Sequence, residues 1–92
     1  MRRRFLTKDA NERLGLAIQA AFSEIAHKIK GADAAYRDVW DFAKKFLGRR
    51  FTDEELRRDL KVRILRYTHH EILEEEENLL VDRCFKATMR FL

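Results

Sequence analysis

The sequence predicts an all-α protein, folded as a compact bundle of three to four helices. Three observations lead to this prediction. Proline is absent and glycine occurs only three times in 92 residues, so few residues interrupt a helix. Apolar residues recur at intervals of three and four along most of the chain, which gathers them on one helical face. Two segments carry the signature of a helix start, and we expect helices at about 10–30, 34–47, 53–66 and 69–91.

The composition is that of a folded protein with a single domain. Charged residues make up 39% and apolar residues 46% of the chain, which is too apolar for a disordered protein. We expect residues 1–92 to form one helical domain, with 1–7 as a basic N-terminal arm. The lone Cys84 excludes an internal disulfide and fits a reducing compartment, so we expect a cytoplasmic protein. No stretch reaches about 18 uncharged apolar residues, so no membrane partner is expected.

The N-terminal arm contains Arg2-Arg3-Arg4-Phe5-Leu6, which resembles a twin-arginine export signal. Such a signal continues into an apolar run, but Asp9 and Glu12 interrupt the run here. We therefore expect the segment to be a basic arm rather than an export signal.

The first helix is expected from about residue 10 to Lys30. Asp9 and Glu12 have the spacing of a capping box, and Gly31 supplies a left-handed position after the last turn. Its predicted buried face consists of Leu14, Ile18, Ala21, Phe22, Ile25 and Ile29. The opposite face carries small or neutral residues, namely Leu16, Gln19, Ala20, Ser23 and His27. Solvated helix faces are usually rich in Lys and Glu, so this face is expected to pack against a partner.

The second helix is expected at about 34–47, capped by Asp33 and ended by Gly48. Its apolar residues are Ala35, Tyr36, Val39, Trp40, Phe42, Ala43, Phe46 and Leu47. They span an arc of roughly 160° at 100° per residue. This arc is broad for a helix with one neighbour, and Trp40 lies at its edge.

The third helix begins at a capping box formed by Thr52 and Glu55, with Phe51 and Leu56 placed to form a hydrophobic staple. Its predicted buried face consists of Leu56, Leu60, Ile64 and Tyr67. Val62 and Leu65 point elsewhere, and this smaller apolar patch is expected to meet another partner.

The fourth helix is expected to begin near residue 69, because Thr68 and Glu71 repeat the spacing of Thr52 and Glu55. Its apolar stripe consists of Ile72, Leu73, Leu80, Cys84, Ala87 and Phe91. Glu74–Glu77 surround one helical turn, so one carboxylate must face the stripe; we expect this turn to project beyond the core. An unbroken helix from 53 to 92 is the alternative.

No constellation of residues predicts an enzyme, a metal or a cofactor. Glu24 and His27 have the spacing of two metal ligands on adjacent turns, but a di-iron bundle needs two such pairs and further carboxylates. Cys84 lies on an apolar stripe and is expected to be a small buried hydrophobe. The only serine, Ser23, lies on a helix of small residues, and no glycine-rich turn is present to expose it or to cradle a phosphate.

Positive charge is concentrated in the first half of the chain and in residues 44–66. Residues 1–50 hold 12 Lys and Arg against 6 acidic residues, whereas 51–92 hold 8 against 10. The candidate phosphate contacts are Arg2, Arg3, Arg4, Lys44, Lys45, Arg49, Arg50, Arg57, Arg58 and Lys61. A recognition helix would present its first turn to the DNA groove, and here that turn is Asp53–Glu55, which phosphate would repel. Any contact is therefore expected with the backbone alone.

Two functions remain after these exclusions. The first is a small non-enzymatic protein–protein interaction module, a regulator, inhibitor or assembly factor that acts by occupying a protein surface. Its predicted interaction residues are Leu16, Ala20, Ser23, His27, Trp40, Val62 and Leu65. A homodimer is also expected, because 92 residues have limited means to bury both faces of the first helix. The alternative is a protein that contacts nucleic acid through the basic residues named above.

Overall fold

The computed structural model describes residues 7–68 and 72–91, and the regular secondary structure of this part consists of helices alone. Four α-helices follow one another, α1 (Lys8–Ser23), α2 (Ala32–Leu47), α3 (Asp53–Thr68) and α4 (Glu74–Met89), with a 3-10 helix, η1 (Ala26–Lys28), after α1. The prediction of an all-α bundle is therefore confirmed, with four helices in the described part of the chain.

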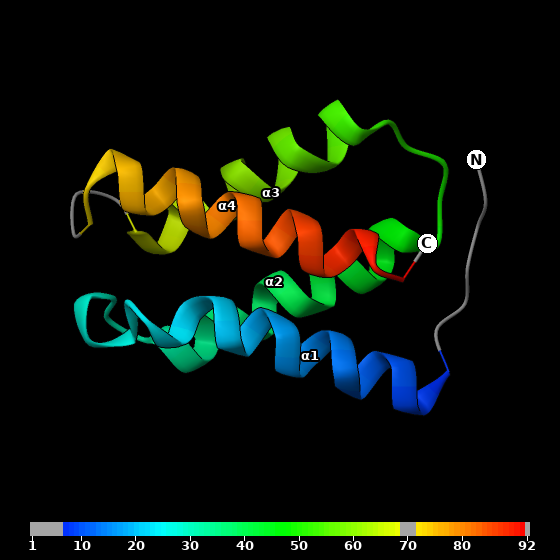
Figure 1. Ribbon diagram of the computed structural model, residues 1–92, viewed down its shortest axis with the longest axis horizontal. Helices are drawn as coiled ribbons and strands as arrows, with labels where there is room; N and C mark the ends of the chain where they lie inside the picture. Colours follow the sequence, from blue (N-terminus) through cyan, green and yellow to red (C-terminus); the bar gives the residue numbers. More distant parts are fainter. Residues whose placement is uncertain (1–6, 69–71, 92) are drawn as a thin grey trace.

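The helices are arranged as a ring of contacts. In Figure 1, α1 and α4 lie side by side in the nearer layer, and α2 and α3 lie behind them. Helix α1 packs on α2, α2 on α3, α3 on α4, and α4 on α1. The bundle measures 36 × 26 × 16 Å. This arrangement explains the broad apolar arc of α2, which has to cover both α1 and α3.

The core contains the apolar faces expected from the three- and four-residue spacing. Phe22 and Phe46 are its largest fully buried side chains. Around them lie Leu14, Ile18, Val39, Leu47, Leu56, Leu60, Ile64 and Cys84. Every helix contributes at least one of these residues, so one apolar cluster holds the bundle together.

Helix α1 begins earlier and ends earlier than predicted. Its N-cap is Thr7, whose hydroxyl oxygen accepts the N–H of Ala10 at 3.1 Å. The helix ends at Ser23, whose hydroxyl donates to the Ala20 carbonyl at 2.8 Å. The expected helix to Lys30 is therefore wrong, because the chain tightens into η1 after the last turn of α1.

The start of α2 also differs from the prediction. Gly31 has the expected left-handed backbone, with φ of 74°, but it serves as the N-cap of α2. The helix begins at Ala32, so Asp33 lies in the first turn instead of capping it. Its carboxylate there still complements the positive end of the helix dipole. Gly48 follows the last residue of α2, as predicted.

Helix α3 begins at the predicted residue. The N–H of Glu55 donates to the Thr52 hydroxyl oxygen at 3.2 Å, and that hydroxyl lies 3.3 Å from a Glu55 carboxylate oxygen. Phe51 and Leu56 on either side are both buried, as a hydrophobic staple requires.

Helix α4 begins at Glu74 and not near residue 69, so Thr68 is not its cap. Thr68 is the last residue of α3, wholly buried, and its hydroxyl donates to a Glu77 carboxylate oxygen at 3.2 Å. Leu73 has an extended backbone and donates its N–H to Glu76 at 3.1 Å. This extended residue excludes one unbroken helix from 53 to 92. The predicted repeat of the capping box includes residues 69–71, which lie outside the described part.

The turn Glu74–Glu77 does not project beyond the core as expected. Glu77 is the carboxylate that faces inward, and it is only 8% exposed. Its burial is tolerated because Thr68 supplies a hydrogen bond. Glu76 forms an ion pair with Lys28, while Glu74 and Glu75 remain exposed.

Candidate protein-interaction surface

The predicted interaction residues do not share one surface. Leu16 and Trp40 line a groove between α1 and α2, whereas Ala20 lines a second groove between α1 and α4. Val62 and Leu65 lie on α3, exposed to 55% and 37%. Ser23 ends α1 and His27 lies in η1; both are exposed. The sequence identified residues that are exposed, but it did not reveal which of them share a surface.

The α1/α2 groove is a hollow of about 260 Å³. It is lined by Glu12, Gly15, Leu16, Gln19, Tyr36 and Trp40. Leu16 stands at its edge with 64% of its surface exposed. An exposed leucine beside two half-buried aromatic rings gives this groove a mainly apolar character.

The Trp40 indole is fixed in the α1/α2 groove by two contacts with α1. Its N–H donates to the Asn11 side-chain oxygen at 2.9 Å. Gly15 leaves room for the ring, because a Cβ at that position would lie 2.6 Å from the indole. The roles of Asn11 and Gly15 were not predicted from the sequence. The signal was the glycine inside a helical pattern, which often marks a close approach of another group.

The α1/α4 groove has a floor of small residues and a basic rim. Its main hollow, of about 340 Å³, is lined by Ala17, Ala20, Ala21, Ala87, Arg83, Lys86 and Arg90. The three cations come from α4 and its C-cap residue Arg90, where intervals of three and four residues place them on one side of the helix. This spacing was visible in the sequence, but the alanine floor depends on which side of α1 meets α4.

A smaller hollow of about 130 Å³ continues the α1/α4 groove toward the start of α4. Arg83 lines both hollows and forms an ion pair with Glu24 on α1. Further along, Lys28 and Glu76 form an ion pair at 2.8 Å. The hydrogen bond from Lys28, followed by the one from the Leu73 N–H, lowers the pKa of Glu76. These pairs neutralise this end of the groove, beside the half-exposed Leu79.

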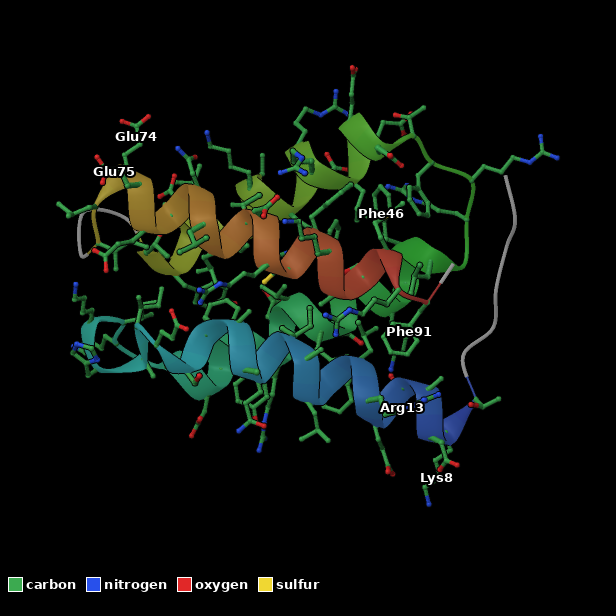
Figure 2. The ribbon with its side chains drawn as sticks, viewed as in Figure 1. Lys8, Arg13, Phe46, Glu74, Glu75 and Phe91 are labelled. Atoms are coloured by element: carbon green, nitrogen blue, oxygen red, sulfur yellow. The ribbon has the colours of Figure 1, made fainter. Side chains whose placement is uncertain are left out.

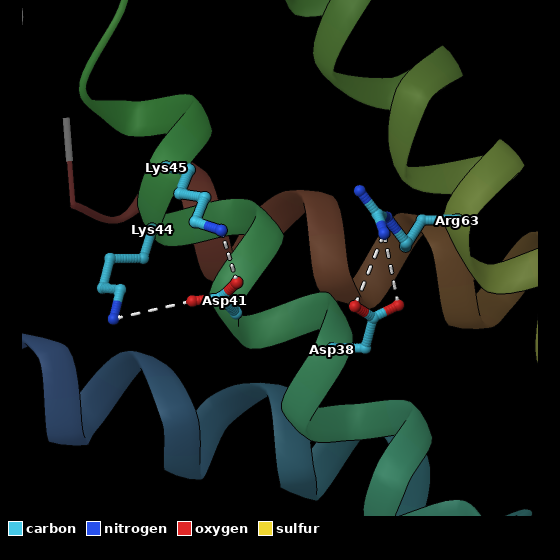
Figure 3. Close-up of polar contacts among 5 residues, drawn as sticks. All are labelled: Asp38, Asp41, Lys44, Lys45 and Arg63. Carbon is cyan, nitrogen blue, oxygen red and sulfur yellow. Dashed lines mark hydrogen bonds and ion pairs between the residues drawn. The ribbon is translucent and has the colours of Figure 1, made fainter.

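Most cations in the basic segment 44–66 already have acidic partners. Lys44 and Lys45 both pair with Asp41, at 3.7 and 2.9 Å (Figure 3). The hydrogen bond from Lys45 is the main cause that lowers the pKa of Asp41. Arg63 pairs with Asp38 at 3.4 Å, so two acids of α2 form ion pairs with three of the cations.

The Asp38 carboxylate also links α2 to the end of α3. The Tyr67 hydroxyl donates to it at 2.8 Å, and this hydrogen bond raises the pKa of Tyr67. The Arg63 guanidinium lies 4.8 Å from the centre of the Phe42 ring. Arg63 of the basic segment 44–66 is therefore part of the contact between α2 and α3.

Three further arginines of the basic segment are paired. Arg49 and Arg58 both lie near Asp59, at 3.6 and 3.4 Å. Arg57 pairs with Asp82 of α4 at 3.2 Å. Lys86, followed by Arg57, lowers the pKa of Asp82 through hydrogen bonds. Five of the predicted phosphate contacts, Lys44, Lys45, Arg49, Arg57 and Arg58, are therefore engaged within the protein.

The other predicted phosphate contacts differ from these five. Arg50 and Lys61 are exposed and form no ion pair with the residues that the structure describes. Arg2, Arg3 and Arg4 lie outside the described part. Among the described candidates, Arg50 and Lys61 are therefore the two that could contact phosphate without first breaking an ion pair within the protein.

Cys84 is wholly buried between the helices, as the sequence predicted. Burial raises the pKa of its thiol to about 12, so the thiol is protonated near neutral pH. Its contribution is to packing. Within residues 7–68 and 72–91, no three His, Cys, Asp or Glu side chains converge as metal ligands would.

No protein-family model, curated protein or solved structure matches this chain. Among the helices described, none is both long enough and apolar enough to cross a lipid bilayer.

Proposed function

We propose that this protein is a small non-enzymatic interaction module, a regulator, inhibitor or assembly factor that acts by occupying the surface of another protein. The observation that supports this best is the α1/α2 groove, in which the exposed Leu16 stands beside the fixed indole of Trp40. Large apolar side chains are usually withdrawn from water, and an exposed leucine next to an aromatic hollow is typical of a binding surface.

The energetics of such a contact favour these two residues. Complete burial of a leucine side chain contributes about 1.5–3 kcal/mol. Tryptophan is among the residues that most often dominate a protein interface. Because Asn11 and Gly15 already hold the Trp40 ring, binding would cost little additional side-chain entropy.

The lining of the α1/α2 groove indicates the chemistry of the partner. Glu12 is its one charged lining residue, on the turn of α1 before Leu16. We therefore expect the partner to insert an apolar side chain and to place a lysine or arginine near Glu12.

Affinity purification with mass spectrometry tests this proposal. The wild-type chain, Leu16→Lys and Leu73→Lys are compared, each with and without nuclease. Leu16 and Leu73 are exposed to 64% and 66%, so Leu73→Lys makes the same change at an equally exposed leucine and is the matched control. We expect a protein that survives nuclease, is lost with Leu16→Lys and is retained with Leu73→Lys. Equal recovery with all three chains would exclude the α1/α2 groove.

The alternative function is contact with a nucleic-acid backbone. Arg50 and Lys61 support it, because they are exposed and form no ion pair within the described residues. The acidic partners of Lys44, Lys45, Arg49, Arg57 and Arg58 argue against it, since each pair would have to open to meet phosphate. In the same purification, a capture that disappears with nuclease would favour this alternative.

A further inference from the structure

One row of side chains follows the outer side of α4 along the α1/α4 groove. Glu75, Leu79, Arg83, Lys86 and Arg90 are spaced by four, four, three and four residues, which places them on one side of a helix. The row begins with a carboxylate, continues with a leucine that is 48% exposed, and ends with three cations. Its two ends therefore carry opposite charges.

We infer that a second copy of this chain docks on the α1/α4 groove, with the two α4 helices antiparallel across a two-fold axis. This inference goes beyond the proposed function, because it concerns the other groove of α1 and a different partner.

The two ends of the row complement each other only in the antiparallel orientation. Glu75 and Arg90 are exposed and form no ion pair with other described residues, so both are available to a second copy. An antiparallel arrangement brings Glu75 of each copy to Arg90 of the other. A parallel arrangement would place like charges together, which is unfavourable.

The start of α1 lies at the end of the bundle where α4 ends (Figure 1). Figure 2 shows Lys8 and Arg13 at the end of the bundle where α1 begins, and Glu74 and Glu75 at the opposite end, where α4 begins. Arg13 precedes Ala17 by four residues, so it lies on the turn next to the alanine floor. Asp9 and Glu12 balance the charges of Lys8 and Arg13, so the start of α1 adds no net charge to this end, and Glu12 lines the α1/α2 groove on the other side of α1.

The spacing along the row also places the exposed Leu79 of one copy opposite the main hollow of the α1/α4 groove of the other. Leu79 follows Glu75 by four residues, and Lys86 precedes Arg90 by four. When Glu75 lies opposite Arg90 of the second copy, Leu79 lies at the level of its Lys86 and Ala87. At that level, Ala87 helps to line the hollow of about 340 Å³. Symmetry repeats this contact, so both Leu79 side chains leave water.

A charge swap measured by sedimentation equilibrium tests the arrangement. Arg90→Glu and Glu75→Arg are each expected to raise the dimer dissociation constant at least about tenfold, because like charges then face each other. The double variant with both substitutions in one chain restores the opposite charges. It is expected to return the constant to within about threefold of the wild-type value.

Glu74→Arg is the matched control, since it makes the same change one residue away from the row and should leave the constant unaltered. Circular dichroism checks that every variant retains its helices. The inference is overturned if the wild-type chain stays monomeric at about 100 µM, if the double variant fails to recover, or if assembly continues beyond a dimer.

The outcome is separable from that of the proposed function. A monomeric chain whose captured protein is lost with Leu16→Lys would remove this inference and leave the proposed function standing. If the dimer responds to the charge swap as expected but no other protein is captured, this inference would stand. The proposed binding to a foreign protein would then be excluded.

Discussion

The Trp40 indole lies directly against Gly15, on the side of α1 where any other residue would carry a Cβ. The Cβ of an alanine at this position would lie 2.6 Å from the ring, which is closer than two carbon atoms can approach. The indole therefore fixes how closely α1 and α2 approach each other at the α1/α2 groove.

We expect Gly15→Ala to destabilise the protein. Overpacking in a well-packed region destabilises by about 1–3 kcal/mol. The higher helix propensity of alanine offsets part of this cost, because it stabilises a helix by about 1 kcal/mol relative to glycine. The net free energy of unfolding should fall by up to about 2 kcal/mol, with a shift in tryptophan fluorescence. Urea unfolding measures the change. In a Trp40→Leu background the same substitution should become neutral or stabilising, and equal losses in both backgrounds would contradict the close contact.

Thr52→Ala should lower the free energy of unfolding by about 0.5–2 kcal/mol, because the Glu55 N–H loses its hydroxyl acceptor at the start of α3. Thr52→Ser keeps the hydroxyl and serves as the control. Thermal unfolding of the three chains measures the difference. An unchanged midpoint for Thr52→Ala would show that this cap contributes nothing.

Thr68→Val should also destabilise the protein, but for a different reason. Valine keeps the shape of threonine and removes the hydroxyl that donates to the buried Glu77 carboxylate. A buried acceptor without its donor costs about 1–3 kcal/mol. Thr68→Ser, which keeps the hydroxyl, should lose less stability than Thr68→Val in urea unfolding. The reverse order would exclude this hydrogen bond as the source of the effect.

Acidification should weaken the contact between η1 and α4. The pKa of Glu76 is lowered from the ordinary value of 4.5, chiefly by Lys28. Stability from this group is therefore complete above that value and is lost as the pH falls through the lower, folded-state value. Glu76→Gln should make the thermal midpoint less dependent on pH between about 5 and 3. An identical dependence in wild type and variant would contradict the prediction.

Ala20→Arg should dissociate the dimer that we infer. Ala20 lines the hollow beside Arg83 and Lys86, so an arginine there adds bulk and a like charge. Because Ala20 is exposed in the single chain, helicity should be unaffected. Sedimentation of this variant is compared with Ala34→Arg, an equally small exposed residue on α2. Loss of the dimer in both variants would point to an effect of charge alone.

Binding to a generic DNA duplex should be negligible at physiological salt, with no affinity tighter than about a micromolar dissociation constant. The ion pairs of Arg49 and Arg57 with Asp59 and Asp82 are the reason. If binding occurs, each contacted phosphate contributes about −0.9 to the slope of log affinity against log salt concentration. Arg50→Ala should then reduce the magnitude of this slope by about 1. Fluorescence anisotropy over a salt series measures both quantities.

Thr52 and Thr68 show how far the sequence could predict the fold. Both stand three residues before a glutamate, yet Thr52 caps a helix and Thr68 ends one. A cap is local, so the start of α3 was predictable. The role of Thr68 depends on Glu77, which belongs to the next helix and approaches only in the folded protein. In the same way, Ile25 and Ile29 are buried as predicted, but their spacing does not distinguish an α-helix from the 3-10 turn between them.

The candidate surface was predictable only as a set of exposed residues. Leu16 lay on the predicted outer face of the first helix and is exposed. The grooves on either side of α1 depend on the order in which the helices surround the core. Periodicity gives the buried side of each helix, but it does not say which neighbour lies to its left or right. The pairing of Arg57 with Asp82 depends on the same arrangement.

The contact between α1 and α4 has a consequence for how the chain acquires its structure during synthesis. Helix α4 covers apolar residues of both α1 and α3, and it is translated after both of them. While Leu80, Val81 and Cys84 are still inside the ribosome, the first three helices have an uncovered apolar side. The core can close only when α4 has emerged, so the first three helices are expected to reach their native packing only after α4 is outside the ribosome.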